Sequence, residues 1–419
     1  MNGREGGTGP HPTAGRLRRL AEQPADHSIE RRPSLLDRLM RRVTRHAHGI
    51  KTAWRDSAIA AREQHRNRAA LLAEATALAL RGRMAVDTYF HYRLFDSKLT
   101  RAAKRRYLPE APKANERLWS TLTPREYGCL YNNKVIFHRF FKAVGLPLAA
   151  LFGVFDPAVG RTEEGRPLRS APELTELLRR CGQNGFVFKP AEGVRGHLTL
   201  VFRGPSADSG DTYVTLGGQR YDAAALVAAS RITKALKAQS PDARLSSFLI
   251  EERIRPHPEL VDFIGPTLCT ARVLTIIARD GSPQIVGSVF KVQPSAVGVD
   301  HLLYGAVACW IDPDTGALGP GRTRTHCDYV TTVPGTERPL VGYRLPLWPQ
   351  VKALALDAAA AFPWARAIGW DIAIAEGGPV LVEGNERWSP SLLQLPAPRG
   401  LMDGELEALY RARRNGSLS

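Results

Sequence analysis

The sequence predicts an α+β protein built from helices and antiparallel hairpins. Strand-like apolar runs occur throughout the second half of the chain, and short glycine-containing turns join several of them. Such turns connect antiparallel neighbours, whereas a parallel doubly wound sheet requires a crossover helix between paired strands. Residues 34–105, by contrast, are rich in Ala, Leu and Arg, and this composition favours helices.

The bulk composition is that of a globular protein. The 419 residues include 43% hydrophobic and 24% charged side chains, and a chain of this length can form two or three domains. The five cysteines are scattered and form no CxxC pair, so we expect neither a disulfide framework nor a thiolate zinc site. Because we find no apolar run of roughly 18 residues and no secretory signal, we expect a cytoplasmic protein.

The amino-terminal region carries much of the formal net charge of +17. Residues 1–33 are rich in Gly, Pro and Arg without periodicity, and we expect a disordered basic tail there. From Ser34 an apolar face surrounded by arginines predicts a helix, and residues 56–82 are predicted to be helical as well. The first helix could dock on the protein's own core or lie peripherally on the inner face of an anionic membrane. We expect no nucleic-acid partner.

The later elements follow in a mixed order. An aromatic segment at residues 87–96 is expected to form a buried helix. Strands are predicted at 185–190, 197–202, 212–216 and 247–254, and a helix is predicted at 221–238. Turns are predicted at Gly217-Gly218, Asp280-Gly281 and Glu376-Gly377-Gly378. The last two turns join strands 271–278 to 283–292 and 369–375 to 379–385.

The last hairpin carries a candidate metal site. Asp371 lies near the start of one strand and Glu383 and Asn385 near the end of its partner, so the hairpin brings the three side chains together. Glu383 and Asn385 are two residues apart and project from the same face. Two carboxylates and an amide oxygen are hard ligands of the kind that Mg²⁺ takes together with nucleotide phosphates. An ordinary solvated hairpin end is an equal alternative for the spacing alone.

A glycine loop follows the strand at 185–190. Lys189 ends this strand, and Gly193 and Gly196 precede the next one. Glycines let the backbone approach phosphate closely, and Lys189 could direct a charge to the same group. A plain hairpin loop is the alternative, and the loop is neither a Walker loop nor a dinucleotide fingerprint.

Acids lie around the exit of the strand at 247–254. Glu251, Glu252 and Glu259, with the backbone between them, could hydrogen-bond an adenine amino group and ribose hydroxyls. A strand that simply enters solvent would look the same.

Three cations complete the set of candidates. Lys134 lies in NNKVIFHRFF, whereas Arg272 and Lys291 lie between apolar residues of predicted strands. A buried cation is costly unless an anion pairs with it. The partner could be a phosphate or a structural carboxylate such as Asp371, and we favour phosphate.

In this order the clusters resemble the ATP-grasp superfamily, and more closely the sugar-transfer-associated ATP-grasp family, which is related to glutamate ligases. The likeness covers about residues 87–398 and includes the segments NNKVIFHRFFKAVGLPLA, VFKPAEGVRG, LIEERIRPHPEL, GWDIAI and VLVEGN. It implies an ATP-grasp fold, in which two α+β subdomains clasp ATP, here with a helical, basic N-terminal extension.

The resemblance also implies roles for single residues. The residues that would contact ATP are Lys134, Lys189, Glu192, Gly193, Gly196, Glu251, Glu252, Ile254 and Glu259, with Gly193 to Gly196 as a flap. The residues that would neutralise the transferring phosphate are Arg272 and Lys291. The residues that would hold two Mg²⁺ ions are Asp371, Glu383 and Asn385. ATP and Mg²⁺ are therefore the implied cofactors.

The expected domains are a tail at 1–33, a helical region at 34–105, an N-terminal subdomain at 106–184, an ATP-grasp subdomain with the flap at 185–255, and a C-terminal subdomain with the metal site at 256–419.

The expected function is an ADP-forming carboxylate–amine ligase that acts through an acyl phosphate. The resemblance suggests a sugar acid and an amino acid as substrates, in glycan or natural-product biosynthesis. Related ligases usually have Arg where Lys291 stands, and Lys keeps the charge but loses the bidentate geometry. Two alternatives stay open: a kinase with His197, Asp300 or His301 as base, and a membrane-docked regulatory protein that only binds ATP.

Overall fold

The computed structural model describes residues 35–80, 84–109, 112–192, 199–238, 247–293, 305–324 and 327–415. Several sequence-based predictions lie outside these residues, namely the tail at 1–33, Gly193, Gly196, His197, Asp300 and His301. The chain divides into two compact units, Met1–Ala47 and His48–Ser419, and every element after α2 (Leu35–Glu63) belongs to the second. Among the described helices none has the length and apolar composition of a membrane span.

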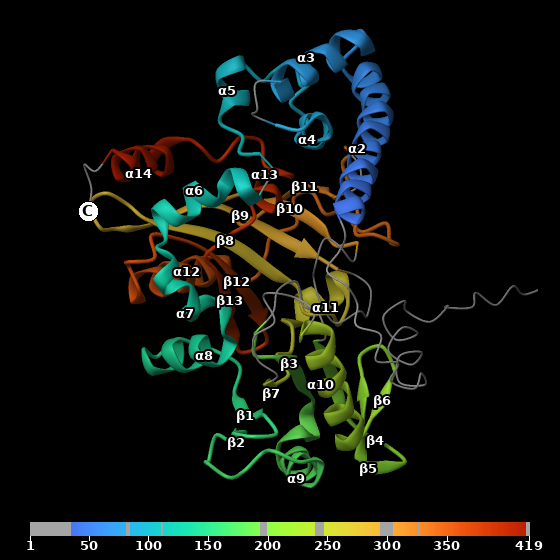
Figure 1. Ribbon diagram of the computed structural model, residues 1–419, viewed down its shortest axis with the longest axis vertical. Helices are drawn as coiled ribbons and strands as arrows, with labels where there is room; N and C mark the ends of the chain where they lie inside the picture. Colours follow the sequence, from blue (N-terminus) through green and yellow to red (C-terminus); the bar gives the residue numbers. More distant parts are fainter. Residues whose placement is uncertain are drawn as a thin grey trace, which may run out of the picture. The chain divides into compact units, whose positions relative to one another are not determined.

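The helical region precedes the sheets, as its composition predicts. Its helices are α2, α3 (Arg68–Leu80), α4 (Val86–His91) and α5 (Arg101–Arg105) (Figure 1). The continuous helix predicted over 56–82 is wrong, because His65 has a left-handed φ of 50° and the Asn67 side chain caps the start of α3. The aromatic segment forms α4 and a turn, with Tyr89 and Phe90 fully buried.

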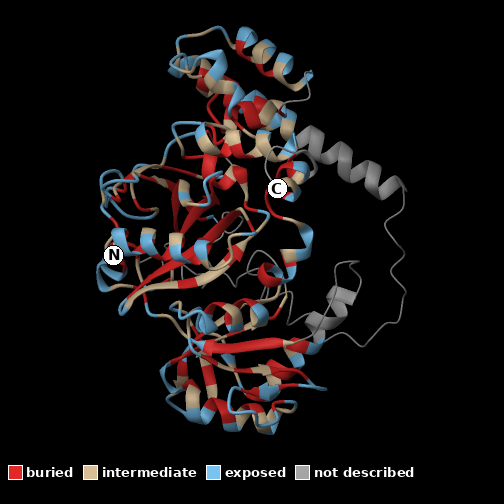
Figure 2. Cartoon of the chain, turned by 90° about the vertical axis from the view of Figure 1, so that its left-hand side faces the viewer, coloured by how far each residue is buried: buried red, intermediate tan, exposed pale blue. Residues whose placement is uncertain are grey.

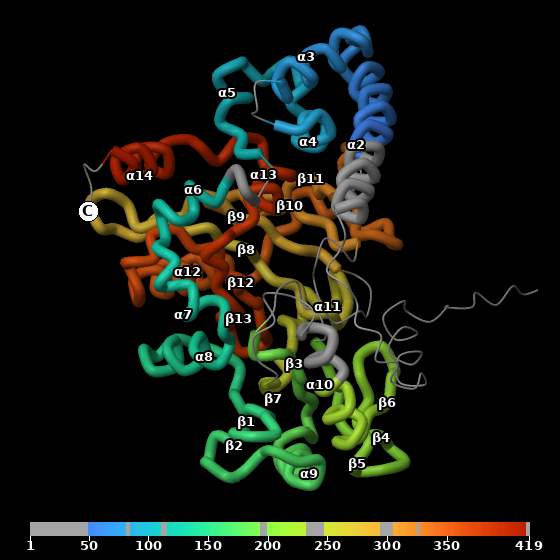
Figure 3. Tube along the Cα trace, viewed as in Figure 1, coloured from blue at the N-terminus to red at the C-terminus, as the bar shows by residue number. Residues whose placement is uncertain are grey.

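A second helical stretch leads into the sheets. It contains α6 (Pro112–Leu122), the 3₁₀ turn η1 (Arg125–Tyr127), α7 (Gly128–Asn132) and α8 (Lys134–Ala143). Figure 3 follows this stretch, in teal, to the red β12–β13 hairpin, and both α7 and α8 contact β13. Segments more than 200 residues apart in the sequence therefore lie side by side.

The first sheet has seven strands in the order β2-β1-β7-β3-β4-β5-β6. The strands are β1 (Leu151–Phe155), β2 (Arg161–Thr162), β3 (Phe186–Pro190), β4 (Leu200–Ser206), β5 (Ser209–Thr215), β6 (Arg220–Tyr221) and β7 (Phe248–Glu252). All neighbours in this sheet are antiparallel. The pairing of β1 with β7 joins strands that are far apart in the sequence. The helices α9 (Ala171–Cys181) and α10 (Ala223–Ala238) cover its apolar face, and the turn η2 (Gly182–Asn184) precedes β3.

The second sheet has six strands in the order β11-β10-β9-β8-β12-β13, again all antiparallel. The strands are β8 (Thr270–Ile277), β9 (Pro283–Val292), β10 (Val307–Ile311), β11 (Leu318–Arg322), β12 (Ala367–Ala375) and β13 (Gly378–Asn385). The associated helices are α11 (Pro258–Ile264), α12 (Trp348–Ala361), α13 (Pro390–Gln394) and α14 (Gly404–Arg414).

Both faces of the six-stranded sheet are packed. Residues of α8, α11 and α12 share one apolar cluster with its strands, and residues of α6, α13 and α14 share another. Figure 2 shows the resulting buried residues, in red, along the strands. Because side chains alternate along a strand, neighbouring residues of β8 contribute to different clusters: Val273 belongs to the first and Leu274 to the second.

Local turn chemistry explains the hairpins. Gly218, Gly281 and Gly378 have φ of 82°, 88° and 123°, a conformation that glycine adopts without strain. The three predicted hairpins are therefore confirmed, at β5–β6, β8–β9 and β12–β13. The predicted α+β class with antiparallel pairing is confirmed as well.

The helical region docks on β11 through buried polar contacts. Arg322 donates a hydrogen bond to the His91 carbonyl at 2.6 Å, and Arg93 donates one to the Cys327 carbonyl at 2.9 Å. The His91 ring lies 3.8 Å from the fully buried Asp56 carboxylate. Burial lowers the pKa of His91, against the opposing effect of nearby carboxylates, so the neutral ring is favoured.

Candidate functional site

One face of the six-stranded sheet carries a row of charged side chains. Arg272 of β8 is opposite Asp371 of β12, which in turn is opposite Glu383 of β13. Lys291 of β9 lies two residues beyond Val289, the partner of Arg272, so its side chain projects from the same face. Four predicted site residues from four strands therefore meet on one face.

The Asp371 carboxylate holds the two cations of this row. Arg272 donates from Nε to Oδ1 at 2.6 Å and from Nη2 to Oδ2 at 2.8 Å, which is a bidentate pair. The Lys291 ammonium lies 3.3 Å from Oδ2. Of the two partners considered for these buried cations, phosphate or a structural carboxylate, this structure therefore has the carboxylate.

The Asp371 carboxylate is held in the ionised state. The side chains of Asp371, Arg272 and Lys291 are only 5%, 9% and 8% exposed. Burial alone would raise the pKa of Asp371, but the Arg272 and Lys291 charges outweigh it and hold that pKa well below its usual value. Asp371 is therefore a carboxylate at neutral pH.

A glycine makes room for the Arg272 side chain. A Cβ at Gly369 would lie 2.9 Å from the Trp388 Cβ and 3.2 Å from the Arg272 Cδ. The first distance is shorter than real Cβ atoms show, so a larger residue at this position would shift one of these neighbours.

Glu383 and Asn385 lie beside the buried cluster and are half-buried. The Asn385 amide donates to the Gly369 carbonyl at 3.2 Å and to Glu383 Oε1 at 3.4 Å. A register shift between Asp371 and Ile372 inserts Val382 into the ladder. The shift lies beside the Asp371–Glu383 pair and bends the strand at the predicted metal site.

The donor set fits Mg²⁺. A carboxylate from Glu383 and an amide oxygen from Asn385 are hard ligands, and Asp371 has lone pairs beyond those that Arg272 uses. No group of three or more His, Cys, Asp or Glu side chains with a metal-binding arrangement occurs within the described ranges. Three protein oxygen donors would leave further coordination positions of Mg²⁺ for water or a ligand such as a phosphate.

A second group lies on the seven-stranded sheet. The Lys189 ammonium of β3 is 2.6 Å from Glu251 Oε2 of the neighbouring strand β7, and both side chains are nearly buried. Glu252 is exposed and Ile254 is half-buried. The two residues thus lie where the chain leaves β7, at the expected hinge.

The hinge joins the two sheets. Pro256 forms a bridge with Ala375 at the end of β12, and the His257 N–H donates to the Ile374 carbonyl at 2.9 Å. Glu259 follows in α11 as an exposed side chain, and its carbonyl accepts from the Tyr343 hydroxyl at 3.3 Å.

A third group positions the start of the loop after β3. The Lys134 N–H donates to the Ala191 carbonyl at 2.8 Å, and the Asn133 amide donates to Glu192 Oε1 at 3.0 Å. The Asn133 oxygen also caps α8, because it accepts from the N–H groups of Val135 and Ile136.

Asn133 was not among the residues predicted from the sequence. An Asn directly before an apolar-periodic run is the N-cap signal, so the segment NNKVIF contained the information.

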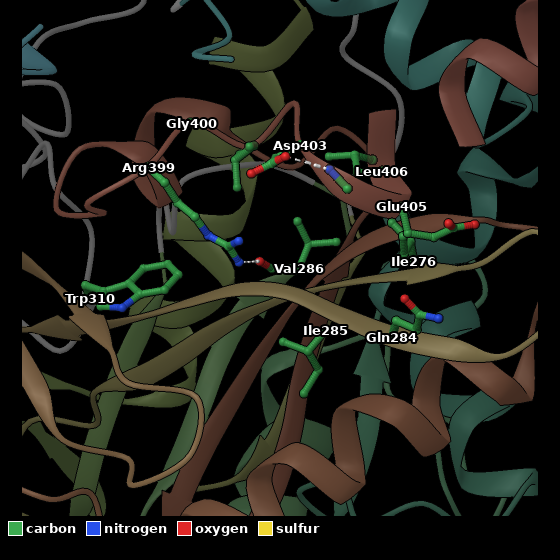
Figure 4. Close-up of a pocket in the computed structure, with 12 residues that line it drawn as sticks. Ile276, Gln284, Ile285, Val286, Trp310, Arg399, Gly400, Asp403, Glu405 and Leu406 are labelled. Atoms are coloured by element: carbon green, nitrogen blue, oxygen red, sulfur yellow. Dashed lines mark hydrogen bonds between the residues drawn. The ribbon is translucent and has the colours of Figure 1, made fainter. Parts of the chain in front are cut away.

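A separate pocket lies at the far end of the six-stranded sheet (Figure 4). Its empty volume is ≈ 680 Å³, and its lining includes Trp310, Arg399 and Glu405. The residues that line it do not include Arg272, Lys291, Asp371, Glu383 or Asn385, so the pocket is distinct from the charged site.

Comparison with known proteins finds a matching family and several similar solved structures. A family model described as sugar-transfer associated ATP-grasp matches residues 113–409. No curated protein sequence matches the chain. Similar solved structures include the biotin carboxylase domain of the Hydrogenobacter thermophilus 2-oxoglutarate carboxylase, with 11% identity, a TM-score of 0.40, and coverage of 68% of this chain and 46% of that one.

Two further structures show a similar extent of likeness. The D-alanine-D-alanine ligase from Coxiella burnetii has 13% identity and a TM-score of 0.35, with coverage of 69% of this chain and 60% of that one. The biotin carboxylase from Campylobacter jejuni has 12% identity and a TM-score of 0.42, with coverage of 73% and 52%. The chain thus spans about half to three fifths of the length of these structures.

Proposed function

The chain belongs to the sugar-transfer associated ATP-grasp family, and from this premise we propose that it is an ATP- and Mg²⁺-dependent carboxylate–amine ligase. The observation that carries the proposal is the ionised Arg272–Asp371–Lys291 cluster, which adjoins the oxygen donors Glu383 and Asn385. Phosphoryl transfer needs positioned cations and metal ligands more than a side-chain nucleophile, and this cluster supplies both. The family description mentions only an association with sugar transfer; on this ground we propose a sugar acid as the carboxylate and an amino acid as the amine.

The reaction has two steps. An oxygen of the acceptor carboxylate attacks the γ-phosphorus of ATP, the bond from that phosphorus to the bridging oxygen breaks, and ADP leaves. The amine nitrogen then attacks the carbonyl carbon of the acyl phosphate. The carbon–oxygen bond to phosphate breaks, and the proton lost by the amine goes to solvent or to the leaving phosphate. No redox change and no covalent enzyme intermediate are involved.

The residues of the cluster act electrostatically. Arg272 and Lys291 are fixed donors next to the metal ligands, so they can stabilise the negative charge that develops on the transferring group. A γ-phosphate would compete with Asp371 for these two cations. Binding of the nucleotide is thus expected to loosen the ion pair that the structure contains.

Glu383, Asn385 and Asp371 would hold Mg²⁺. When bound, the metal would neutralise phosphate charge. Lys134, Lys189 and Glu192, with the flap, would bind the phosphates. Adenine and ribose would be bound by Glu251, Glu252, Ile254 and Glu259. The Lys189–Glu251 ion pair would place the phosphate-binding residues next to the adenine-binding residues.

A hydroxylamine trap tests the proposal. The purified chain is incubated with ATP, Mg²⁺, hydroxylamine and a panel of uronic acids and amino acids, and products are identified by mass. Hydroxylamine converts an acyl phosphate to a hydroxamate, so the ligase forms ADP and hydroxamate in equal amounts. ADP with a phosphorylated hydroxyl on the acceptor would instead identify a kinase and end the ligase proposal. The control variant Glu407→Gln changes a partly exposed carboxylate on α14, and it should form both products as the wild type does.

A further inference from the structure

Three arginines gather where the hinge leaves the seven-stranded sheet. Arg253 follows β7, and its N–H donates to the Gly185 carbonyl at 3.4 Å. Gly185 also abuts β4, since a Cβ there would lie 2.5 Å from the Phe202 carbonyl oxygen and 2.9 Å from the Arg203 carbonyl oxygen. Gly185 therefore lets the backbones at Arg203 and Arg253 approach it from two sides, and Arg255 follows two residues later.

These arginines differ from others on or near the same sheet. Arg166, Arg179, Arg180 and Arg220 each have a carboxylate within 4.0 Å, at distances of 3.3, 2.5, 3.7 and 2.9 Å. Within the part of the chain that the structure describes, Arg203, Arg253 and Arg255 have no such partner. The Arg203 guanidinium donates instead to the Leu216 carbonyl at 2.8 Å.

The arrangement is costly without a ligand. Arg253 is half-buried, and burial together with the charges of Arg255 and Arg203 lowers its pKa from the ordinary value. A partly desolvated cation beside like charges destabilises the fold unless an anion offsets the repulsion. No carboxylate of the described chain does so, and an anionic ligand would.

The cluster also opens on the side of the sheet that carries the Lys189–Glu251 pair. Phe202 packs in the apolar core, whereas Arg203 is exposed at a register shift between β4 and β5, so its side chain turns away from that core. Val201 pairs with Val187, and Val187 and Lys189 alternate with the core residues Phe186 and Phe188, so these side chains lie on the face away from the core. Lys189 lies four residues beyond Gly185, roughly 13 Å along an extended strand, so one phosphate group cannot contact both places.

We infer that Arg203, Arg253 and Arg255 form a second anion site, which binds a phosphate group on a soluble small-molecule ligand. Planar guanidinium groups bind phosphate oxygens with paired hydrogen bonds, and three of them match a dianionic group. The site goes beyond the proposed function, because that function assigns phosphate binding to other residues. On the proposed reaction, it would hold a phosphorylated acceptor.

Calorimetric titration of the full chain with inorganic pyrophosphate, without ATP or Mg²⁺, tests the inference. Arg203→Ala/Arg253→Ala is expected to weaken pyrophosphate binding about 10-fold or more, because hydrogen bonds to a charged ligand are lost. The control Arg179→Ala/Arg220→Ala removes the same charge from two arginines that are paired with aspartates, and it should change the affinity less than about 2-fold.

Two further measurements keep the test independent of catalysis. Without ligand, Arg203→Ala/Arg253→Ala should melt no lower than the wild type, since it removes repulsion, and it should bind Mg²⁺-ATP as the wild type does. Equal losses in both double variants would show unspecific charge attraction and overturn the site. An equal loss of Mg²⁺-ATP affinity would assign the arginines to the nucleotide and overturn it as well.

A vesicle assay separates a soluble ligand from a lipid headgroup. The full chain is mixed with vesicles of phosphatidylglycerol in phosphatidylcholine, and sedimentation measures binding. The inference predicts equal sedimentation of the wild type and Arg203→Ala/Arg253→Ala. Vesicle binding that disappears in this variant, without a matching loss of pyrophosphate binding, would contradict a soluble ligand.

Discussion

Replacing Asp371 by asparagine removes the anion that two buried cations share. Asparagine keeps the shape but not the charge, so Arg272 and Lys291, with side chains 9% and 8% exposed, would lose the charge of Asp371 that each of them contacts. Breaking a buried ion pair from one side costs about 3–5 kcal/mol, mostly because the remaining charge is desolvated. For a folded unit of about 150–250 residues, this loss of stability corresponds to a melting temperature that is lower by about 6–20 °C.

Thermal and urea unfolding of Asp371→Asn and Glu407→Gln measure this effect. Glu407 pairs with Arg411 at 2.5 Å on the exposed surface of α14, so its loss should cost less than about 0.5 kcal/mol. If Asp371→Asn costs less than about 1 kcal/mol, the cluster is solvated or neutral and the electrostatic reasoning fails.

Acid should reproduce the effect of the substitution. Because the folded-state pKa of Asp371 lies below its unfolded value of about 3.9, the ionised carboxylate contributes its full stability above that pH. The contribution decreases as the pH falls toward the folded pKa. The difference in unfolding free energy between the wild type and Asp371→Asn should therefore narrow below about pH 4, and a constant difference would contradict the assignment.

Three other changes test the surrounding structure. Burial favours neutral His91, so wild-type stability should fall as the pH drops below the unfolded His pKa of about 6.5, and His91→Gln should flatten that part of a urea-denaturation pH profile. Gly369→Ala should overpack the strand at the ion pair and cost about 1–3 kcal/mol in urea unfolding. Asn133→Ala should lower the free energy of unfolding by about 1 kcal/mol through the lost helix cap, and it should weaken ATP binding because the contact with Glu192 is lost. Asn67→Ala, which removes a helix cap elsewhere, should leave the ATP affinity measured by calorimetry unchanged.

The hairpins could be predicted because their causes are local. Asp280-Gly281 and Gly377-Gly378 sit between apolar runs, and a tight turn fixes which residues oppose each other. The turn at residues 376–378 brings Asp371 close to Glu383, and the register shift that inserts Val382 then makes the two residues opposite, so the turn made the candidate metal site visible in one short segment but not its exact pairing. Membership of the sugar-transfer associated ATP-grasp family rests on the family model that matches residues 113–409.

Long-range pairings could not be predicted in the same way. Arg272 and Asp371 are 99 residues apart, and nothing local in either strand determines that β8 and β12 become neighbours. The sequence therefore left two partners open for Arg272. Lys189 and Glu251 could not be paired from the sequence for the same reason. We predicted separate roles for them, whereas in the structure they form one ion pair because β3 lies beside β7.

Helix interruptions depend on single residues that propensity does not reveal. Residues 56–82 have a strongly helix-forming composition throughout, yet the helix is interrupted after α2, where His65 adopts a positive φ. Packing of the two helices against the aromatic cluster around Tyr89 selects this break. The amino-acid composition of a segment reports an average helix propensity, whereas tertiary packing acts on individual residues.

Calorimetric titration of Mg²⁺-ATP into Glu383→Gln and Glu386→Gln tests the central claim most directly. Glu383 faces Asp371 across the hairpin, whereas Glu386, three residues later, is hydrogen-bonded to the Asn132 side chain at 2.9 Å. If the hairpin holds the metal, Glu383→Gln weakens Mg²⁺-dependent ATP binding about 10-fold or more and Glu386→Gln leaves it within about 2-fold of the wild type. Mg²⁺-ATP binding by Glu383→Gln that equals the wild type would contradict a metal site at this hairpin.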